Sequence, residues 1–145
     1  MTDAARRILL GILLLGVAGI SAELFLLNHI EDANQWIPLA LCGATVVMSL
    51  VVAVKPTKAT VRLFQLVMLL MIVSGAVGIY LHYGATTEFQ LEMDPTLTGF
   101  ALFKKAIVAK APPALAPGAM TQLGLIGLAY TFRHPSTRSG AGAGT

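Results

Sequence analysis

Long, mainly apolar runs are the feature of this sequence that most constrains its fold. Four such runs cover residues 8–30, 36–54, 61–83 and 113–132, and most charged residues lie between them. A helix needs about 20 largely apolar residues to cross the hydrocarbon core of a bilayer, so each run is long enough. Backbone groups in lipid need partners within their own segment, and the alternation of β-barrel strands is missing, so the runs predict helices.

The composition excludes a soluble globular domain. Hydrophobic residues make up 56% of the chain and charged residues only 12%, whereas soluble domains carry roughly 25% charged residues. We therefore expect an all-α integral membrane protein with one four-helix transmembrane domain over residues 1–134 and a flexible tail over 135–145. The first run also resembles a secretory signal peptide, but it continues to a full spanning length, and Ile20 is bulky where cleavage needs a small residue.

Basic residues predict the orientation of the chain. Seven of the ten precede the first run, separate the second from the third, or follow the fourth: Arg6, Arg7, Lys55, Lys58, Arg62, Arg133 and Arg138. The positive-inside rule assigns such segments to the cytoplasm, so we expect a multi-pass protein of the cell membrane with both termini inside. Of the seven acidic residues only Asp3 shares that side. The outer face is therefore predicted to be acidic.

The predicted outer loop, residues 84–112, contains two local patterns. Apolar residues alternate with acidic and amide residues over 88–94, and this period of two predicts a short extended strand. Asp94 and Pro95 follow, and an N-cap aspartate before a proline is typical of a helix start. We therefore expect a short amphipathic helix from Pro95 to about Ala109 at the outer membrane interface.

Glycines at helical spacing predict the packing faces of the spanning helices. They form one pair in each of the first, third and fourth runs: Gly16 and Gly19, Gly75 and Gly78, Gly124 and Gly127. Small residues on one face let membrane helices approach closely, so we expect these six residues at helix contacts.

Glu23 is a carboxylate within the first spanning run. Such a group costs several kcal/mol in lipid, so we expect it to face the interior of the helix bundle and to have a partner. At about 1.5 Å per residue, Glu23 and His82 lie at comparable depths in the outer half, and His29 lies level with His82. We therefore predict a contact between Glu23 and His82.

Three chemistries fit these residues. Glu23, His29 and His82 would bind zinc or another divalent transition metal, with further carboxylates nearby from Glu31, Asp32, Glu88 and Glu92. The same carboxylate and imidazoles would also suit a proton-linked site for a transported ion or small molecule. His29 and His82 would alternatively serve as the two axial ligands of a haem.

The function classes can be narrowed further. Hydrolase, nucleotide-binding and cysteine–histidine motifs are missing from the sequence, so no catalytic residue is predicted, and no basic block indicates nucleic acid. The sequence favours an accessory, assembly or scaffold subunit, with an acidic outer surface, that binds another membrane protein or further copies of itself. A metal-binding or proton-coupled transport protein is the alternative, and a bis-histidine haem protein is the third.

Overall fold

The computed structural model describes residues 1–29, 31–109 and 114–138. All regular secondary structure in these ranges is helical, which confirms the all-α prediction. The elements are α1 (Asp3–Leu26), the short 3-10 helix η1 (Ala33–Gln35), α2 (Trp36–Val54), α3 (Lys58–Met93), α4 (Gly99–Ile107), α5 (Leu115–Thr131) and α6 (Pro135–Arg138).

Three segments are long and apolar enough to cross a membrane. They are Asp3–Leu26, Ala33–Val54 and Lys58–Met93, which contain α1, α2 and α3. These three spans indicate a membrane protein. The fourth predicted crossing corresponds to α5, which has 17 residues. At about 1.5 Å per residue α5 is ~26 Å long, slightly less than a hydrocarbon core of about 30 Å.

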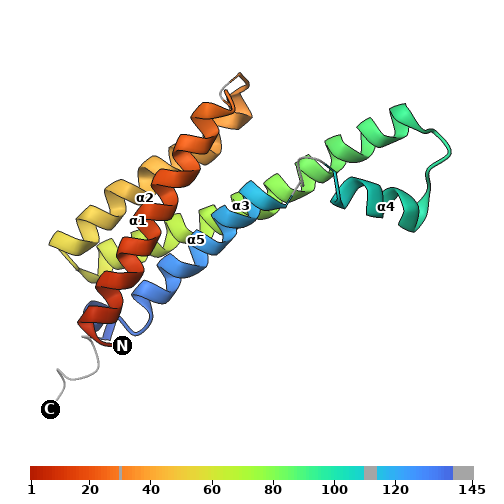
Figure 1. The fold of residues 1–145 in the computed structure, drawn as a ribbon. Helices are drawn as coiled ribbons and strands as arrows, with labels where there is room; N and C mark the ends of the chain where they lie inside the picture. Colours follow the sequence, from red (N-terminus) through yellow and green to blue (C-terminus); the bar gives the residue numbers. More distant parts are fainter. Residues whose placement is uncertain (30, 110–113, 139–145) are drawn as a thin grey trace, which may run out of the picture.

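The helices pack so that α1 and α3 are not direct neighbours. Each of them packs on both α2 and α5, and no Cα atom of α1 lies within 8 Å of one in α3. The most extensive contact joins α3 to α5, which run antiparallel (Figure 1). Buried side chains such as Leu13, Phe64, Met68 and Leu123 form the common core.

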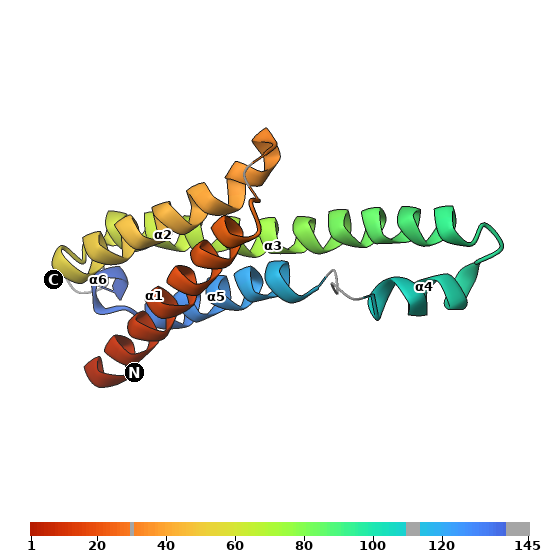
Figure 2. The same cartoon turned by 45° about the horizontal axis from the view of Figure 1, so that its top comes forward.

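One end of the molecule carries the N-terminus, the α2–α3 turn and α6 (Figure 2). We call it the basic end, because it holds six basic residues of α1, the α2–α3 turn, the start of α3 and the α5–α6 connection: Arg6, Arg7, Lys55, Lys58, Arg62 and Arg133. The turn here is short, and Thr57 caps α3 through its hydroxyl, which accepts a hydrogen bond from the Thr60 amide at 3.1 Å. The opposite end carries the α1–α2 connection, and α3 extends beyond it toward α4 (Figure 1).

The strand predicted over residues 88–94 is wrong, because α3 continues as a helix to Met93. Glu, Gln, Leu and Met in this segment are good helix formers, and a short apolar alternation does not by itself exclude a helix. The hydroxyls of Thr86 and Thr87 donate to carbonyls one turn back, each at 2.8 Å. The helix stops at Asp94, since Pro95 follows and disfavours the helical conformation there.

The helix predicted from Pro95 begins later, at Gly99, with Thr98 as its N-cap. Asp94 does not cap it. Its Oδ1 atom instead accepts hydrogen bonds from the amide and hydroxyl of Thr96, at 3.1 and 2.6 Å, which closes a turn over Pro95. These bonds, first that of the Thr96 hydroxyl, lower the pKa of the Asp94 carboxyl.

α4 folds back along the last turns of α3 (Figure 2). Ala106 is fully buried in this contact, and the ring of Phe103 lies 6.1 Å from that of Tyr83, centroid to centroid. We call residues 84–107, which comprise the last turns of α3, the following turn and α4, the outer hairpin, because they extend beyond the other helices (Figure 2). It replaces the loop with a strand that the sequence predicted.

Several predicted boundaries shift at the chain's turns. α1 ends at Leu26, short of residue 30, and Asn28 adopts a positive φ of 52° as the chain turns toward η1. The tail predicted to be flexible from residue 135 begins instead with α6, where the Ser136 hydroxyl donates to the Pro56 carbonyl. Ile30, the start of the predicted fourth run at 113 and the tail from 139 lie outside the described residues.

Candidate functional site

The predicted ligands Glu23, His29 and His82 divide into a histidine pair and a separate carboxylate. The rings of His29 and His82 stack with their centroids 6.0 Å apart. Glu23 is exposed on α1, and over the described ranges no hydrogen bond or ion pair joins it to His82. The predicted contact does not form because α2 and α5 separate α1 from α3.

The other predicted ligands are also dispersed. Glu31 and Asp32 are exposed in the α1–α2 connection, where the Asn28 amide donates to Glu31 Oε1 at 2.9 Å. Glu88 and Glu92 are exposed on the outer hairpin. Within 1–29, 31–109 and 114–138, no three His, Cys, Asp or Glu residues are grouped so that they could hold a metal ion.

Four of the predicted packing glycines lie in the contact between α3 and α5. A Cβ atom on Gly75 would lie 2.5 Å from the carbonyl oxygen of Pro117, and one on Gly124 would lie 2.7 Å from that of Met68. A Cβ atom on Gly78 or Gly127 would instead meet the side chain of Pro117 or Met68. Real Cβ contacts essentially never fall below 3.0 Å, so the backbones of α3 and α5 approach too closely for any larger residue at Gly75 or Gly124.

The glycine pair of α1 is split between two faces. Gly16 packs against the Leu123 side chain of α5, whereas a Cβ on Gly19 would meet nothing within 4 Å. Gly19 and Glu23 belong to an exposed row at four-residue spacing, together with Gly11 and Leu15, whose side chain is 77% exposed. We call Gly11, Leu15, Gly19 and Glu23 the outer ridge, because they face away from the other helices of this chain. In the single chain Glu23 faces outward, so the prediction that it faces the interior of the helix bundle is wrong.

Arg6, at the basic end, has a structural role that the sequence analysis missed. Its side chain is 8% exposed and donates to the carbonyls of Tyr130, Arg133 and Phe132, at 2.9, 3.1 and 3.4 Å. The last carbonyls of a helix lack partners within the helix, and a cation is favoured there, so Arg6 caps the end of α5. The helical phase of Arg6 indicates this buried role in the sequence, because Arg6 shares a face of α1 with the buried Leu13 and Val17.

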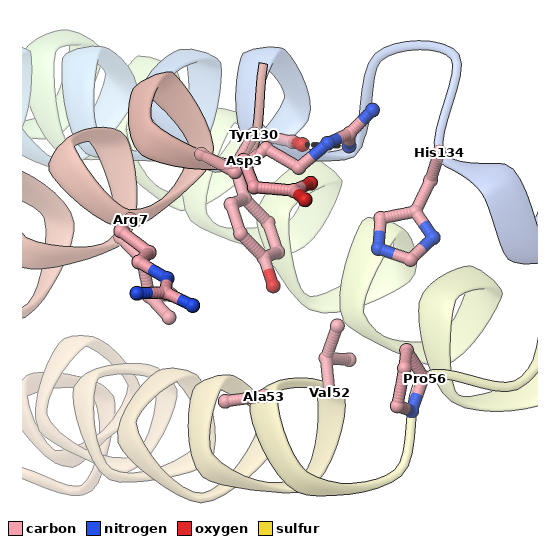
Figure 3. Close-up of a pocket in the computed structure, with 9 residues that line it drawn as sticks. Asp3, Arg7, Val52, Ala53, Pro56, Tyr130 and His134 are labelled. Atoms are coloured by element: carbon pink, nitrogen blue, oxygen red, sulfur yellow. Dashed lines mark hydrogen bonds between the residues drawn. The ribbon is translucent and has the colours of Figure 1, made fainter. Parts of the chain in front are cut away.

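A cavity of about 270 Å³ lies beside Arg6 (Figure 3). Asp3 and Arg7 of α1 border it, and the side chains of Tyr130 and His134 project toward Val52 of α2 and Pro56 after it (Figure 3). Burial, and next the charge of Arg6, lower the pKa of His134, although Asp3 acts in the opposite direction. His134 is therefore neutral at pH 7. Its Nδ1 atom accepts from the Ser136 amide at 3.3 Å, so the proton is on Nε2.

No family model, curated protein or solved structure matches this chain. The function therefore has to be argued from the fold and the side chains.

Proposed function

We propose that this protein is an accessory or assembly subunit of a membrane complex, and that the outer ridge of α1 binds a transmembrane helix of a different membrane protein. In this proposal α5 is a fourth crossing, and both termini lie in the cytoplasm. The packing of α5 along α3 supports the fourth crossing. The basic end supports the orientation, because it holds both the N-terminus and α6.

Glu23 carries the proposal. At about 1.5 Å per residue it lies ~24 Å from Arg7 along α1, within a hydrocarbon core about 30 Å thick. Its side chain is exposed, and it makes no hydrogen bond or ion pair with any residue that the structure describes. A carboxylate that faces lipid is costly, and such groups in membrane proteins are usually paired. A group from outside this chain would supply that partner.

The shape of the outer ridge also suits a helix contact. Neither Gly11 nor Gly19 has an atom within 4 Å of the position a Cβ would take, so both expose bare backbone to the surroundings. Leu15 lies between them and is 77% exposed. A second helix can approach the backbone closely at Gly11 and at Gly19, on either side of Leu15. Such close approach drives helix association in lipid.

The charge on the ridge favours a different protein over a second copy. A symmetric dimer through the same face would place the two Glu23 carboxylates opposite each other. Like charges at short range are unfavourable, and more so in a medium of low dielectric constant. The expected partner helix therefore presents small residues and a hydrogen-bond donor such as Lys, Arg, Asn or Ser.

The outer hairpin adds a second contact surface in this proposal. It holds three acidic residues, Glu88, Glu92 and Asp94, of which only Asp94 has an ion pair among the described residues, with Lys105 at 3.7 Å. Phe89, Met93 and Phe100 are exposed beside them, at 57%, 72% and 77%. This combination is typical of a surface that meets another protein outside the hydrocarbon core.

Substitution of Gly19 tests the proposal. In mild detergent we expect the wild-type chain to run in a complex with a second protein, and Gly19→Leu to run alone, because the leucine side chain fills the close-approach surface. Gly43→Leu is the matched control, since Gly43 is a glycine of α2 that is equally exposed and has nothing within 4 Å of its Cβ position. Size-exclusion chromatography with light scattering and peptide identification gives the composition.

Two outcomes would contradict the proposal. One is a Gly19→Leu complex of unchanged mass and composition. The other is a wild-type particle that holds only copies of this chain. Glu23→Gln separates the two features of the ridge, because glutamine keeps the shape and the hydrogen-bonding capacity but removes the charge. We expect it to weaken the complex less than Gly19→Leu does.

A metal-binding or proton-coupled transport function is the second candidate, and the His29–His82 contact favours it. These two imidazoles are 6.0 Å apart between ring centroids and come from segments distant in sequence. Equilibrium dialysis of the purified chain against zinc tests the metal function. One bound zinc per chain, lost in His29→Ala/His82→Ala, would support it over association. Zinc binding that the double variant retains, or none in the wild type, would count against a metal site at this pair.

A further inference from the structure

The cavity at the basic end has the chemistry of an anion site. Two guanidinium groups and one carboxylate border it, from Arg6, Arg7 and Asp3, so its formal charge is +1 with His134 neutral. A single negative charge would neutralise it. The Tyr130 hydroxyl and the Nε2–H of His134 are uncharged hydrogen-bond donors in the same lining.

The two arginines are not equivalent in this lining. Arg6 is buried and holds its guanidinium against the last carbonyls of α5, so its charge is fixed in place. Arg7 is exposed and makes no hydrogen bond or ion pair with any described residue. Its guanidinium is therefore available to a ligand, and guanidinium groups bind phosphate oxygens in a two-pronged geometry.

The lining changes from polar to apolar along α1, toward the middle of the spanning helices. Leu10 lies one helical turn deeper than Arg6 on α1, and Val52 and Ala53 belong to the last turn of the apolar α2. Asp3, the first residue of α1, lies toward the other side. Pro56 and His134 also lie there, outside the three spanning segments. A ligand that fits has an anionic group at the surface and an apolar part that continues toward the lipid.

We propose that this cavity binds the phosphate group of an acidic phospholipid. The phosphate diester carries one negative charge, which balances the lining. Arg7, the Tyr130 hydroxyl and the Nε2–H of His134 supply its hydrogen bonds, while Arg6 contributes fixed positive charge. The glycerol and the start of the acyl chains lie against Leu10 and Val52. Acidic phospholipids are enriched in the cytoplasmic leaflet, the side on which the proposed topology places this end.

Lipid retention by the purified full-length chain tests this site. Native mass spectrometry in detergent, with phosphatidylglycerol or phosphatidylcholine added, gives the number of bound lipids and their relative affinities. We expect one phosphatidylglycerol per chain, preferred over phosphatidylcholine roughly tenfold, because phosphatidylcholine carries the same phosphate but adds a quaternary ammonium group that the positive lining repels. Inorganic phosphate is the third probe, because a site for free phosphate would bind it without the lipid.

Two substitutions probe the cavity in independent ways. Arg7→Gln removes the available guanidinium, and Ala53→Trp fills the cavity without changing its charge. Both should reduce phosphatidylglycerol retention roughly tenfold. Arg62→Gln is the matched control, because Arg62 is an exposed arginine of the basic end that does not line the cavity, and it should retain the lipid.

The proposal is overturned by any of three results. The first is equal retention of both lipids by the wild type. The second is equal loss in Arg7→Gln and Arg62→Gln, which would mean a general surface charge effect. The third is binding of inorganic phosphate with no retention of the lipid. None of them bears on the outer ridge, whose four residues do not line the cavity, so this proposal and the proposed function fail independently.

Discussion

Gly124→Val is expected to lower the free energy of unfolding by about 2 to 3 kcal/mol, a typical cost of overpacking a close contact. A Cβ atom on Gly124 would lie 2.7 Å from the Met68 carbonyl oxygen and 3.2 Å from the Ile72 amide nitrogen, both in the backbone of α3. A backbone atom within a helix cannot rotate away as a side chain can. The two helices would have to separate, and the contact between Gly75 and Pro117 would open with them.

Gly43→Val is the control for this substitution. It makes the same chemical change on α2, where nothing lies within 4 Å of the Cβ position. We expect a change of less than about 0.5 kcal/mol, as is usual for surface substitutions. Unfolding in mixed micelles by increasing amounts of sodium dodecyl sulfate, followed by circular dichroism, gives both values. Equal effects of the two substitutions would mean that the α3–α5 contact is not as close as described.

Arg6→Met is expected to cost about 2 to 3 kcal/mol, because hydrogen bonds from a charged donor contribute roughly 1.5 to 3 kcal/mol and a cation at a helix C-terminus adds to this. Methionine keeps most of the length and apolar stem of the arginine. It removes the donors to Tyr130, Arg133 and Phe132, whose carbonyls then have to be satisfied by water. The same micelle unfolding experiment measures the loss.

Arg7→Met is the matched control, one residue along the same helix. Arg7 is exposed and has no partner among the described residues, so we expect a change below about 0.5 kcal/mol. Arg6→Lys should fall between the two, since one ammonium group cannot reach all the carbonyls that the planar guanidinium spans. If Arg6→Met and Arg7→Met were equally mild, Arg6 would not stabilise the end of α5.

The sequence predicted those features of the fold that depend on local hydropathy. The run over 36–54 coincides with α2, because Trp36 and Lys55 change the polarity abruptly at both ends. The run over 61–83 lies within α3 but did not show how far the helix continues. Hydropathy falls at Gly84, so it predicts the end of the apolar run there. Helix propensity persists until Pro95, and the helix itself therefore continues beyond the apolar run.

The candidate site depended on which helices are neighbours, and local patterns do not contain that information. The predicted contact between Glu23 and His82 rested on their depths along the chain, but it also required α1 to lie beside α3. The close α3–α5 contact through Gly75 and Gly124 instead places α5 between them. With Leu13, Val17, Ile20 and Leu24 as the buried apolar side chains of α1, Glu23 is left exposed.

Arg6 and Arg7 illustrate the same limit at the other end. In the sequence they are two equivalent basic residues before an apolar run. In the structure, helical phase places Arg6 in line with Leu13 and Val17, toward α5, and Arg7 in the cavity lining. A count of charges by side therefore treats the two arginines alike and does not predict their different roles.

Photo-crosslinking in intact membranes tests the central claim, that the outer ridge binds another membrane protein, most directly. A photoreactive amino acid replaces Leu15 on the ridge, and in a separate variant it replaces Val47, which is 57% exposed on α2. We predict a discrete adduct with one other membrane protein from position 15 and none from position 47. No protein adduct from position 15, the same adducts from both positions, or an adduct made only of two copies of this chain would contradict the claim.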